Sequence, residues 1–218
     1  MLIANGGQAT YSPPTTGVLT VLCPVTGRVL RQTVAGGSGY FTDTLAADDA
    51  LVLAYLTIWD TNRLDVFSTA TDKLLRAIPV AAHPLQVTVD STHRQVFVAG
   101  EAASFARECG PQSQPGAITI LDALSGAVKA RIPVGRCPDA LAFDPLTARL
   151  FVSNHEDNTV SVLDAVRGVL RTQRVHLHPH AFAVDELHHK VFVIARFPLR
   201  GGGDPVVAGT GHVPVPLS

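Results

Sequence analysis

Three side chains that could bind a metal ion each stand directly before a proline: His83, Cys137 and His178. Imidazole nitrogens and thiolates are ligands that zinc and copper prefer in proteins. If the fold brings the three positions together, they predict a metal or small-ligand site. The alternative is that each side chain only caps the turn beside its own proline, in which case the three share no ligand.

A short polar segment, His155-Glu156-Asp157-Asn158, offers a base and two carboxylates in consecutive positions. Such groups could form an acid–base pair, but polar residues are also the ordinary way to end a hairpin, and we favour the hairpin interpretation. Trp59, the only tryptophan, lies in a similar segment, where its ring could stack on a ligand or cover the strands below.

Histidines gather in two further places. In the run His176-Leu177-His178-Pro179-His180, alternate residues fall on one strand face, and we count His180 with His178 among the candidate ligand-binding residues. Pro179 interrupts the strand and the run contains no carboxylate, so we interpret it mainly as a group of surface histidines. The pair at 188–189 lies in a turn and is expected to be solvated.

Regularly spaced turns indicate an internal repeat. The equivalent turn residues are Gly27, Asp72, Gly126 and Gly168, at spacings of 45, 54 and 42 residues. An insertion over residues 101–115 accounts for the longest spacing. Repeats of ~40–50 residues are typical of β-propeller blades.

Each repeat contains four predicted strands. In the clearest copy of the repeat, the four strands lie at 141–143, at 151–152, at 160–163 and from 169 onward. The inner strands are continuous apolar runs and the outer strand alternates, as expected of sheets that stack face to face around a channel. The sequence therefore predicts an all-β protein, a β-propeller of four-stranded antiparallel blades.

We expect one domain over residues 1–218, with about four repeats. They are placed at 17–56, 57–100, 101–154 and 155–196, followed by a loop or tail at 197–218.

The repeat resembles the YVTN family of propeller repeats. The resemblance rests on Phe151-Val152-Ser153-Asn154, on the strand 159–164, and on the Ile-Pro-Val sequences at 78–80 and 132–134. It extends over residues 17–195, with a further partial match at Leu2-Ile3-Ala4-Asn5, although one copy lacks the proline and another lacks Ile-Pro-Val. The resemblance implies a propeller and an extracytoplasmic location, but it implies no activity, because propellers support unrelated functions.

The two ends of the chain predict three arrangements. The segments 17–22 and 29–34 look like the last two strands of a blade, and 181–184 and 191–194 look like the first two. Joining them would close a ring of four blades. Otherwise the chain is a fragment of a larger ring, or half of a ring that a second copy completes as a homodimer.

The insertion and the link before Pro138 are expected on the same face. Cys109 and Cys137 could therefore form a disulfide that closes a loop of 27 residues and stabilises the fold by ~3 kcal/mol. Such a bond would indicate an oxidising compartment. The third cysteine, Cys23, has no predicted partner, and no CxxC pair of a zinc site is present.

The composition disfavours several classes of function. Charged residues make up 16% and the net charge is −1, which predicts no nucleic-acid binding. The first residues lack a basic segment followed by an apolar run, and no apolar stretch approaches the ~20 residues of a membrane span. Nucleophile-elbow, Walker and HExxH motifs are also missing.

These observations favour a non-catalytic scaffold that binds a protein or a small molecule through loops on one face, with no cofactor. The alternative is an enzyme of the propeller type, such as a lyase, a lactonase or a metal-dependent oxidoreductase. Its site would lie at the channel mouth and would use His83, His178, Glu156 or Asp157, with a bound metal ion as its distinguishing mark.

Overall fold

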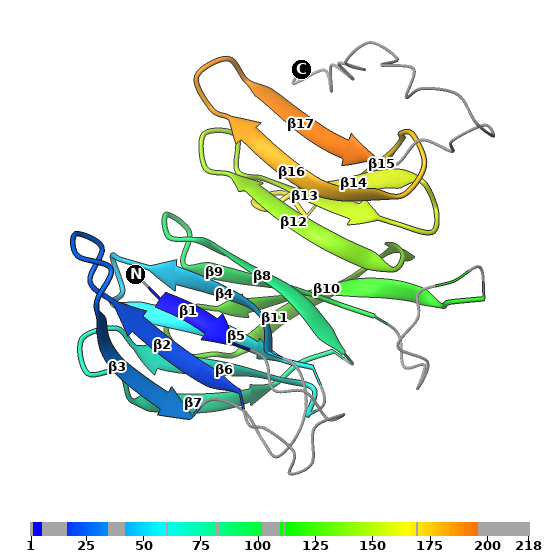
Figure 1. Ribbon diagram of the computed structural model, residues 1–218. Coiled ribbons are helices and arrows are strands. Elements are labelled where there is room, and N and C mark those ends of the chain that lie inside the picture. Colours follow the sequence, from blue (N-terminus) through cyan, green and yellow to red (C-terminus); the bar gives the residue numbers. More distant parts are fainter. Residues whose placement is uncertain are drawn as a thin grey trace, which may run out of the picture.

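In the computed structural model the chain forms antiparallel β-sheets stacked one after another (Figure 1). The structure describes residues 2–5, 17–34, 42–59, 61–81, 83–101, 110, 112–168 and 170–195. Within these residues each sheet is built from strands that are consecutive in the sequence and pair in chain order. The predicted all-β architecture of blade-like, four-stranded sheets is therefore confirmed.

Five sheets are described. The first contains β1 (Leu2–Asn5), β2 (Val18–Leu22) and β3 (Val29–Val34). The second contains β4 (Thr42–Asp48), β5 (Leu53–Ile58), β6 (Arg63–Ser68) and β7 (Leu74–Pro79). The third contains β8 (Pro84–Asp90), β9 (Gln95–Gly100), β10 (Pro115–Asp122) and β11 (Val128–Arg136). The fourth contains β12 (Pro138–Asp144), β13 (Arg149–Asn154), β14 (Thr159–Asp164) and β15 (Leu170–Arg174). The fifth contains β16 (Pro179–Asp185) and β17 (Lys190–Ala195).

The middle strands of the four-stranded sheets are the most buried. Every residue of β5 is buried, as are all but the first residue of β13, whereas β15 at the outer edge is largely exposed. The first strand, β12, is only partly buried along most of its length, although its sequence predicted an innermost, fully buried strand. The reason is that a middle strand has a partner on both edges and a sheet on both faces, while a first strand leaves one edge open.

Apolar layers hold consecutive sheets together. One layer joins the second and third sheets through residues such as Leu64 and Val98, and the next joins the third and fourth through Phe97 and Leu150. In the latter the Phe97 ring stacks on Phe143 with the centroids 5.6 Å apart. Burial of this kind gains roughly 25 cal/mol for each Å² of apolar surface removed from water, so the stacking of sheets is the main source of stability.

One buried hydroxyl, that of Tyr55, pairs with the backbone just beyond a strand of the next sheet. The Tyr55 hydroxyl donates a hydrogen bond of 3.2 Å to the carbonyl of Ala123, which directly follows β10 of the third sheet. Burial, together with the negative charge of Asp48, raises the pKa of Tyr55 to about 12. The hydroxyl therefore stays a donor at any physiological pH and fixes the register of the two sheets.

The turn residues used to define the repeat share a left-handed backbone. Gly27, Asp72, Gly126 and Gly168 have φ angles of 69°, 55°, 75° and 69°. Each lies in the turn that joins the last two strands of its sheet. This conformation costs a glycine nothing, which explains why glycine recurs at the position.

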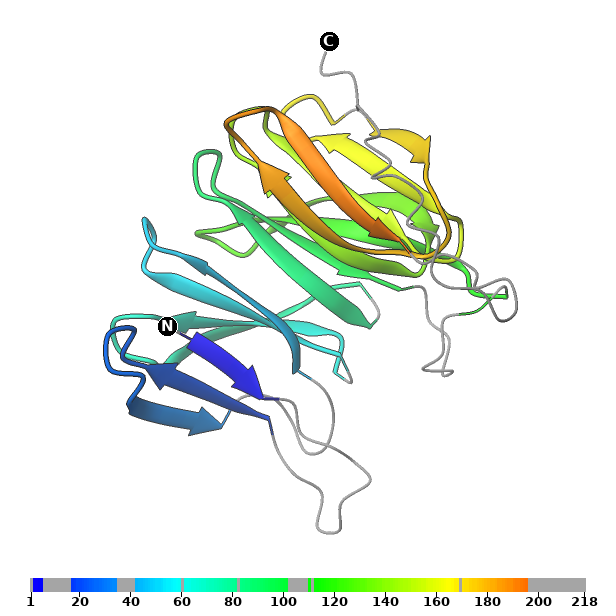
Figure 2. The same ribbon diagram turned by 45° about the horizontal axis from the view of Figure 1, so that its top comes forward.

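The described sheets form an open arc. β1–β3 lie at one end and β16–β17 at the other, with β4, β8, β12 and β16 in contact one after another (Figures 1 and 2). Among the described sheets, therefore, no closed ring of four blades is formed. Its physical obstacle is β1, which pairs with β2 from Leu2 opposite Val21 and occupies the edge that β17 would need.

Some predicted features lie outside the described residues. They are most of the insertion predicted at 101–115, of which residues 102–109 are not described, and the tail predicted at 197–218. In the part of the chain that the structure describes, no helix has the length and apolar character needed to cross a bilayer.

Replacing Phe97 tests the apolar layers. Its side chain is fully buried between the third and fourth sheets, so we expect Phe97→Ala to lower the free energy of unfolding by about 3–5 kcal/mol. Phe192, which is 55% exposed on β17, is the control, and Phe192→Ala should cost about 0.5 kcal/mol or less. Urea unfolding followed by circular dichroism measures both, and equal losses would contradict the assignment of the core.

Acid should weaken the turn after β10. The backbone N–H and hydroxyl of Ser125, together with Lys129, bond the Asp122 carboxylate and lower its pKa well below the ordinary range. A lowered folded-state pKa stabilises the protein above the unfolded pKa of about 4 and loses that effect as the pH falls further. The stability difference between wild type and Asp122→Asn should therefore be constant near neutrality and shrink below pH ~4. Urea titrations over this range would reject the idea if the difference stayed unchanged.

Candidate functional site

The candidate residues lie on one side of the sheets, which we call the loop face. Two kinds of connection lie on this face. We call the turn between the second and third strands of a sheet a tip, and the segment from the fourth strand to the next sheet a link. Both lie at the same end of the strands, because neighbouring strands are antiparallel. The residues before the three prolines, His83, Cys137 and His178, all stand in these links. Their φ angles are 49°, 54° and 51°, a left-handed conformation that non-glycine residues rarely adopt.

An asparagine from the preceding sheet holds two of these strained positions. The backbone N–H of His83 donates to Asn62 Oδ1 at 2.7 Å, and that of His178 donates to Asn158 Oδ1 at 2.8 Å. Both asparagines end a tip. These two links are therefore tied to the tip of the sheet before them, and the capping group is an asparagine of that tip rather than the histidine side chain.

The side chains repeat the same connection. The ring of Trp59 lies against His83 with the centroids 4.2 Å apart and the planes inclined by 31°. The ring of His155 lies against His178 at 4.4 Å and 30°. Trp59 and His155 are each the first residue of a tip, so they occupy equivalent places. One face of Trp59 is consequently covered by an imidazole.

Cys137 takes part in a disulfide, and its side chain is 1% exposed. A sulfur in a disulfide is not a thiolate ligand, so Cys137 does not complete a ring of metal ligands with the histidines. Its predicted partner, Cys109, lies outside the described residues, and that pairing stays a prediction. Cys23 is a free cysteine in the turn after β2.

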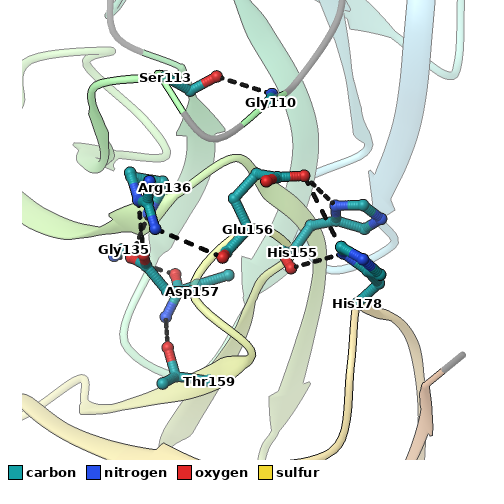
Figure 3. Close-up of polar contacts among 10 residues, drawn as sticks. Gly110, Ser113, Gly135, Arg136, His155, Glu156, Asp157, Thr159 and His178 are labelled. Atoms are coloured by element: carbon teal, nitrogen blue, oxygen red, sulfur yellow. Dashed lines mark hydrogen bonds and ion pairs between the residues drawn. The ribbon is translucent and has the colours of Figure 1, made fainter. Parts of the chain in front are cut away.

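The fourth sheet brings three candidate residues together. His155 Nδ1 lies 3.2 Å from Glu156 Oε1, and His178 Nδ1 lies 4.0 Å from the same oxygen. One ligand atom from each of the three residues lies within 4.8 Å of the others. Figure 3 shows Glu156 with the two imidazoles on one side and Arg136 on the other. Among the described residues this is the group with the composition and spacing of a metal site.

Asp157 faces away from this group and binds Arg136. The Arg136 guanidinium Nε donates to Asp157 Oδ1 at 2.6 Å, and the Arg136 backbone N–H donates to Oδ2 at 2.8 Å (Figure 3). Partial burial opposes ionisation of Asp157, but these hydrogen bonds and the positive charge outweigh it and lower the pKa of the carboxyl. Asp157 therefore anchors the tip and is not available as a general base beside Glu156.

Arg136 was not predicted as part of the site. It ends β11, and its contact with the tip of the next sheet depends on Gly135, whose backbone N–H donates to Asn154 Oδ1 at 3.0 Å. A Cβ at residue 135 would come within 2.6 Å of the Asn154 side chain and 2.7 Å of Asp157 Oδ2. The sequence signal was a Gly-Arg pair directly before the Cys-Pro link, which becomes meaningful only when the packing is known.

The other candidates stay outside the group. His83 lies in an earlier link. His180 lies on β16, where its Nδ1 is 3.1 Å from the carbonyl oxygen of His178. His188 is on the opposite face, where its Nδ1 lies 2.8 Å from Asp185 Oδ2 and its side chain is 62% exposed, as expected for a solvated turn.

The group of His155, Glu156 and His178 can perform two kinds of chemistry. Two imidazoles beside one carboxylate can share a proton, and they can also bind a cation through nitrogen and oxygen. The Glu156 side chain is only 11% exposed, so a charge there interacts more strongly with its neighbours than it would in water.

Peptide mapping tests the predicted partner of Cys137. In a digest made without reductant, the peptide that carries Cys137 should be linked to the peptide that carries Cys109, and Cys109→Ser should leave Cys137 open to alkylation. A Cys137 peptide linked to Cys23, or one fully alkylated before reduction, would contradict the pairing.

Comparisons with known proteins support the fold. No family model matches the chain, so the YVTN resemblance has no independent support, and no curated protein matches its sequence. Among solved structures 690 chains match. One is the Kuenenia stuttgartiensis hydrazine synthase, with a TM-score of 0.66 and 12% sequence identity over 81% of this chain and 55% of that one. At this identity the likeness shows a shared fold alone, and this chain spans about half of the chain that it matches.

Proposed function

We propose that this chain is a binding scaffold of YVTN-type blades that presents its loop face to a protein or a small molecule. One observation carries the proposal: tips and links on that face are fastened to one another across successive sheets. The fastenings are the Trp59–His83 ring pair, the His155–His178 ring pair and the Arg136–Asp157 ion pair.

Fastened loops favour binding for a physical reason. A loop that must become ordered on binding loses roughly 0.5–1.5 kcal/mol for each immobilised side chain, and a loop that is already held avoids most of this cost. Residues on loops that a rigid scaffold positions are also where binding sites usually occur. The tip at 155–158 meets both conditions, because the backbone N–H groups of Gly135 and Arg136 bind Asn154, directly before the tip, and Asp157 within it.

The enzyme alternative keeps one supporting observation, the convergence of His155, Glu156 and His178. Of the four residues predicted for it, only Glu156 and His178 belong to this group. Asp157 is bound to Arg136, and His83 stacks on Trp59 in another link. A propeller-type enzyme would therefore have to work with a single cluster at the edge of one tip, which makes the scaffold the better-supported function.

Site-specific photo-crosslinking in an extract of the native source tests the scaffold function. A photoreactive amino acid replaces Thr61 or Leu177 on the loop face, and Val166 or Leu187 on the opposite face serves as the matched control. All four positions are exposed. We expect crosslinked products from the loop face that an excess of the unmodified chain suppresses, with little product from the controls. Equal products from both faces, or none from either loop-face position, would overturn the proposal.

A further inference from the structure

The His155–His178 ring pair of the fourth sheet lies beside the carboxylate of Glu156, which is not needed to join two sheets. An aromatic ring against the histidine of the next link is enough to join two sheets, as Trp59 and His83 demonstrate. At the equivalent place His155 supplies a second imidazole, and Glu156 extends its carboxylate to both rings (Figure 3). The fourth sheet thus gathers two nitrogen donors and one oxygen donor where the second sheet has a tryptophan and a histidine.

The spacing of the three donors suits a tetrahedral metal ion. Zinc binds histidine nitrogen and carboxylate oxygen at about 2.0–2.1 Å, which places neighbouring ligand atoms about 3.4 Å apart. His155 Nδ1 and Glu156 Oε1 are 3.2 Å apart, and the whole set lies within 4.8 Å. Small rotations of the side chains are sufficient to bring all three atoms around one ion.

The surroundings also favour a cation. Glu156 is 11% exposed, and a buried carboxylate is unfavourable unless a positive charge or a hydrogen-bond donor balances it. The nearest guanidinium, that of Arg136, is paired with Asp157 through the 2.6 Å contact of its Nε. The two imidazoles, or an ion that they bind, lie where they can balance the charge of Glu156.

The backbone contributes an orienting contact. His178 Nδ1 lies 3.2 Å from the carbonyl oxygen of His155, and the His178 backbone N–H is held by Asn158. In metal sites a ligating imidazole commonly donates its other ring N–H to a backbone carbonyl, which fixes the orientation of the ring and its tautomer. When Nδ1 of His178 donates in this way, Nε2 is the nitrogen left to bind an ion. His178 has both restraints before any ion binds.

We infer that His155, Glu156 and His178 bind a divalent transition-metal ion of the zinc class. Imidazole and carboxylate ligands suit zinc and its neighbours in the first transition row better than calcium or magnesium, which prefer oxygen alone. Three protein ligands leave one coordination position open, as in zinc sites that bind a water or a substrate. The inference goes beyond the proposed scaffold function, since the metal alone tests it and its failure leaves partner binding untouched.

Isothermal titration of the chelator-treated full chain with Zn²⁺ is the experiment. We expect one ion per chain, and we expect His155→Ala, Glu156→Gln and His178→Ala each to weaken binding by at least about 100-fold. Glu156→Gln keeps the size of the side chain, so it remains informative if an alanine variant fails to fold. Histidine ring ¹⁵N spectra should shift for His155 and His178 on adding Zn²⁺.

Two matched controls distinguish a built site from scattered surface histidines. His188→Ala removes an imidazole that lies beside a single carboxylate on the opposite face, and His83→Ala removes the imidazole of the equivalent ring pair. Neither should change the affinity. The inference is overturned if wild type takes up no zinc, if the three ligand variants bind as wild type does, or if His188→Ala or His83→Ala accounts for the binding.

Discussion

The structure depends on the apolar contact between consecutive sheets. A middle strand such as β13 is buried on both faces, which is stable only if another sheet covers each face. The layers around Leu64, Phe97 and Phe151 supply these covers in turn, so each sheet is supported by its neighbours. The stacking also sets the spacing between equivalent loops, because each link must travel from the outer edge of one sheet to the inner edge of the next.

That spacing explains why the same contacts recur on the loop face. Each link arrives beside the tip of the sheet before it and turns sharply through a left-handed residue ahead of a proline. Asn62 and Asn158 each bind the backbone of such a residue, and the first residue of each tip covers its side chain. In the remaining link the buried residue is Cys137, whose sulfur is in a disulfide. Different chemistry therefore fastens equivalent positions.

Much of the fold could be predicted from the sequence. The spacing of Gly27, Asp72, Gly126 and Gly168 identified the repeat, because a left-handed turn leaves a local signal in the chain. The closure of the ring could not be predicted, since it depended on whether Leu2–Asn5 pairs with β2, and four residues carry too little pattern to decide that. The depth of burial of first strands was misjudged for a related reason: an open edge is a property of the arrangement and not of the strand.

The candidate site was predictable in its members but not in its grouping. The histidines before prolines and the polar tip at 155–158 were visible as residue types, yet the sequence suggested a ring of His83, Cys137 and His178 across several sheets. The structure joins His178 to the tip of the adjacent sheet instead. Neighbouring loops of consecutive sheets touch, whereas equivalent positions are a whole sheet apart. Arg136 was missed because its role depends on the close approach of Gly135 to Asn154.

The contrast between the second and fourth sheets separates structural need from chemical capacity. Joining a tip to the next link requires only an apolar ring over an imidazole, and Trp59 meets that need with more buried surface and no charge to desolvate. The His155–His178 pair does the same mechanical work but keeps Glu156 nearly buried between polar rings, which is costly for a carboxylate without a cation. The divalent ion that we infer would balance that charge and would use all three donors at once.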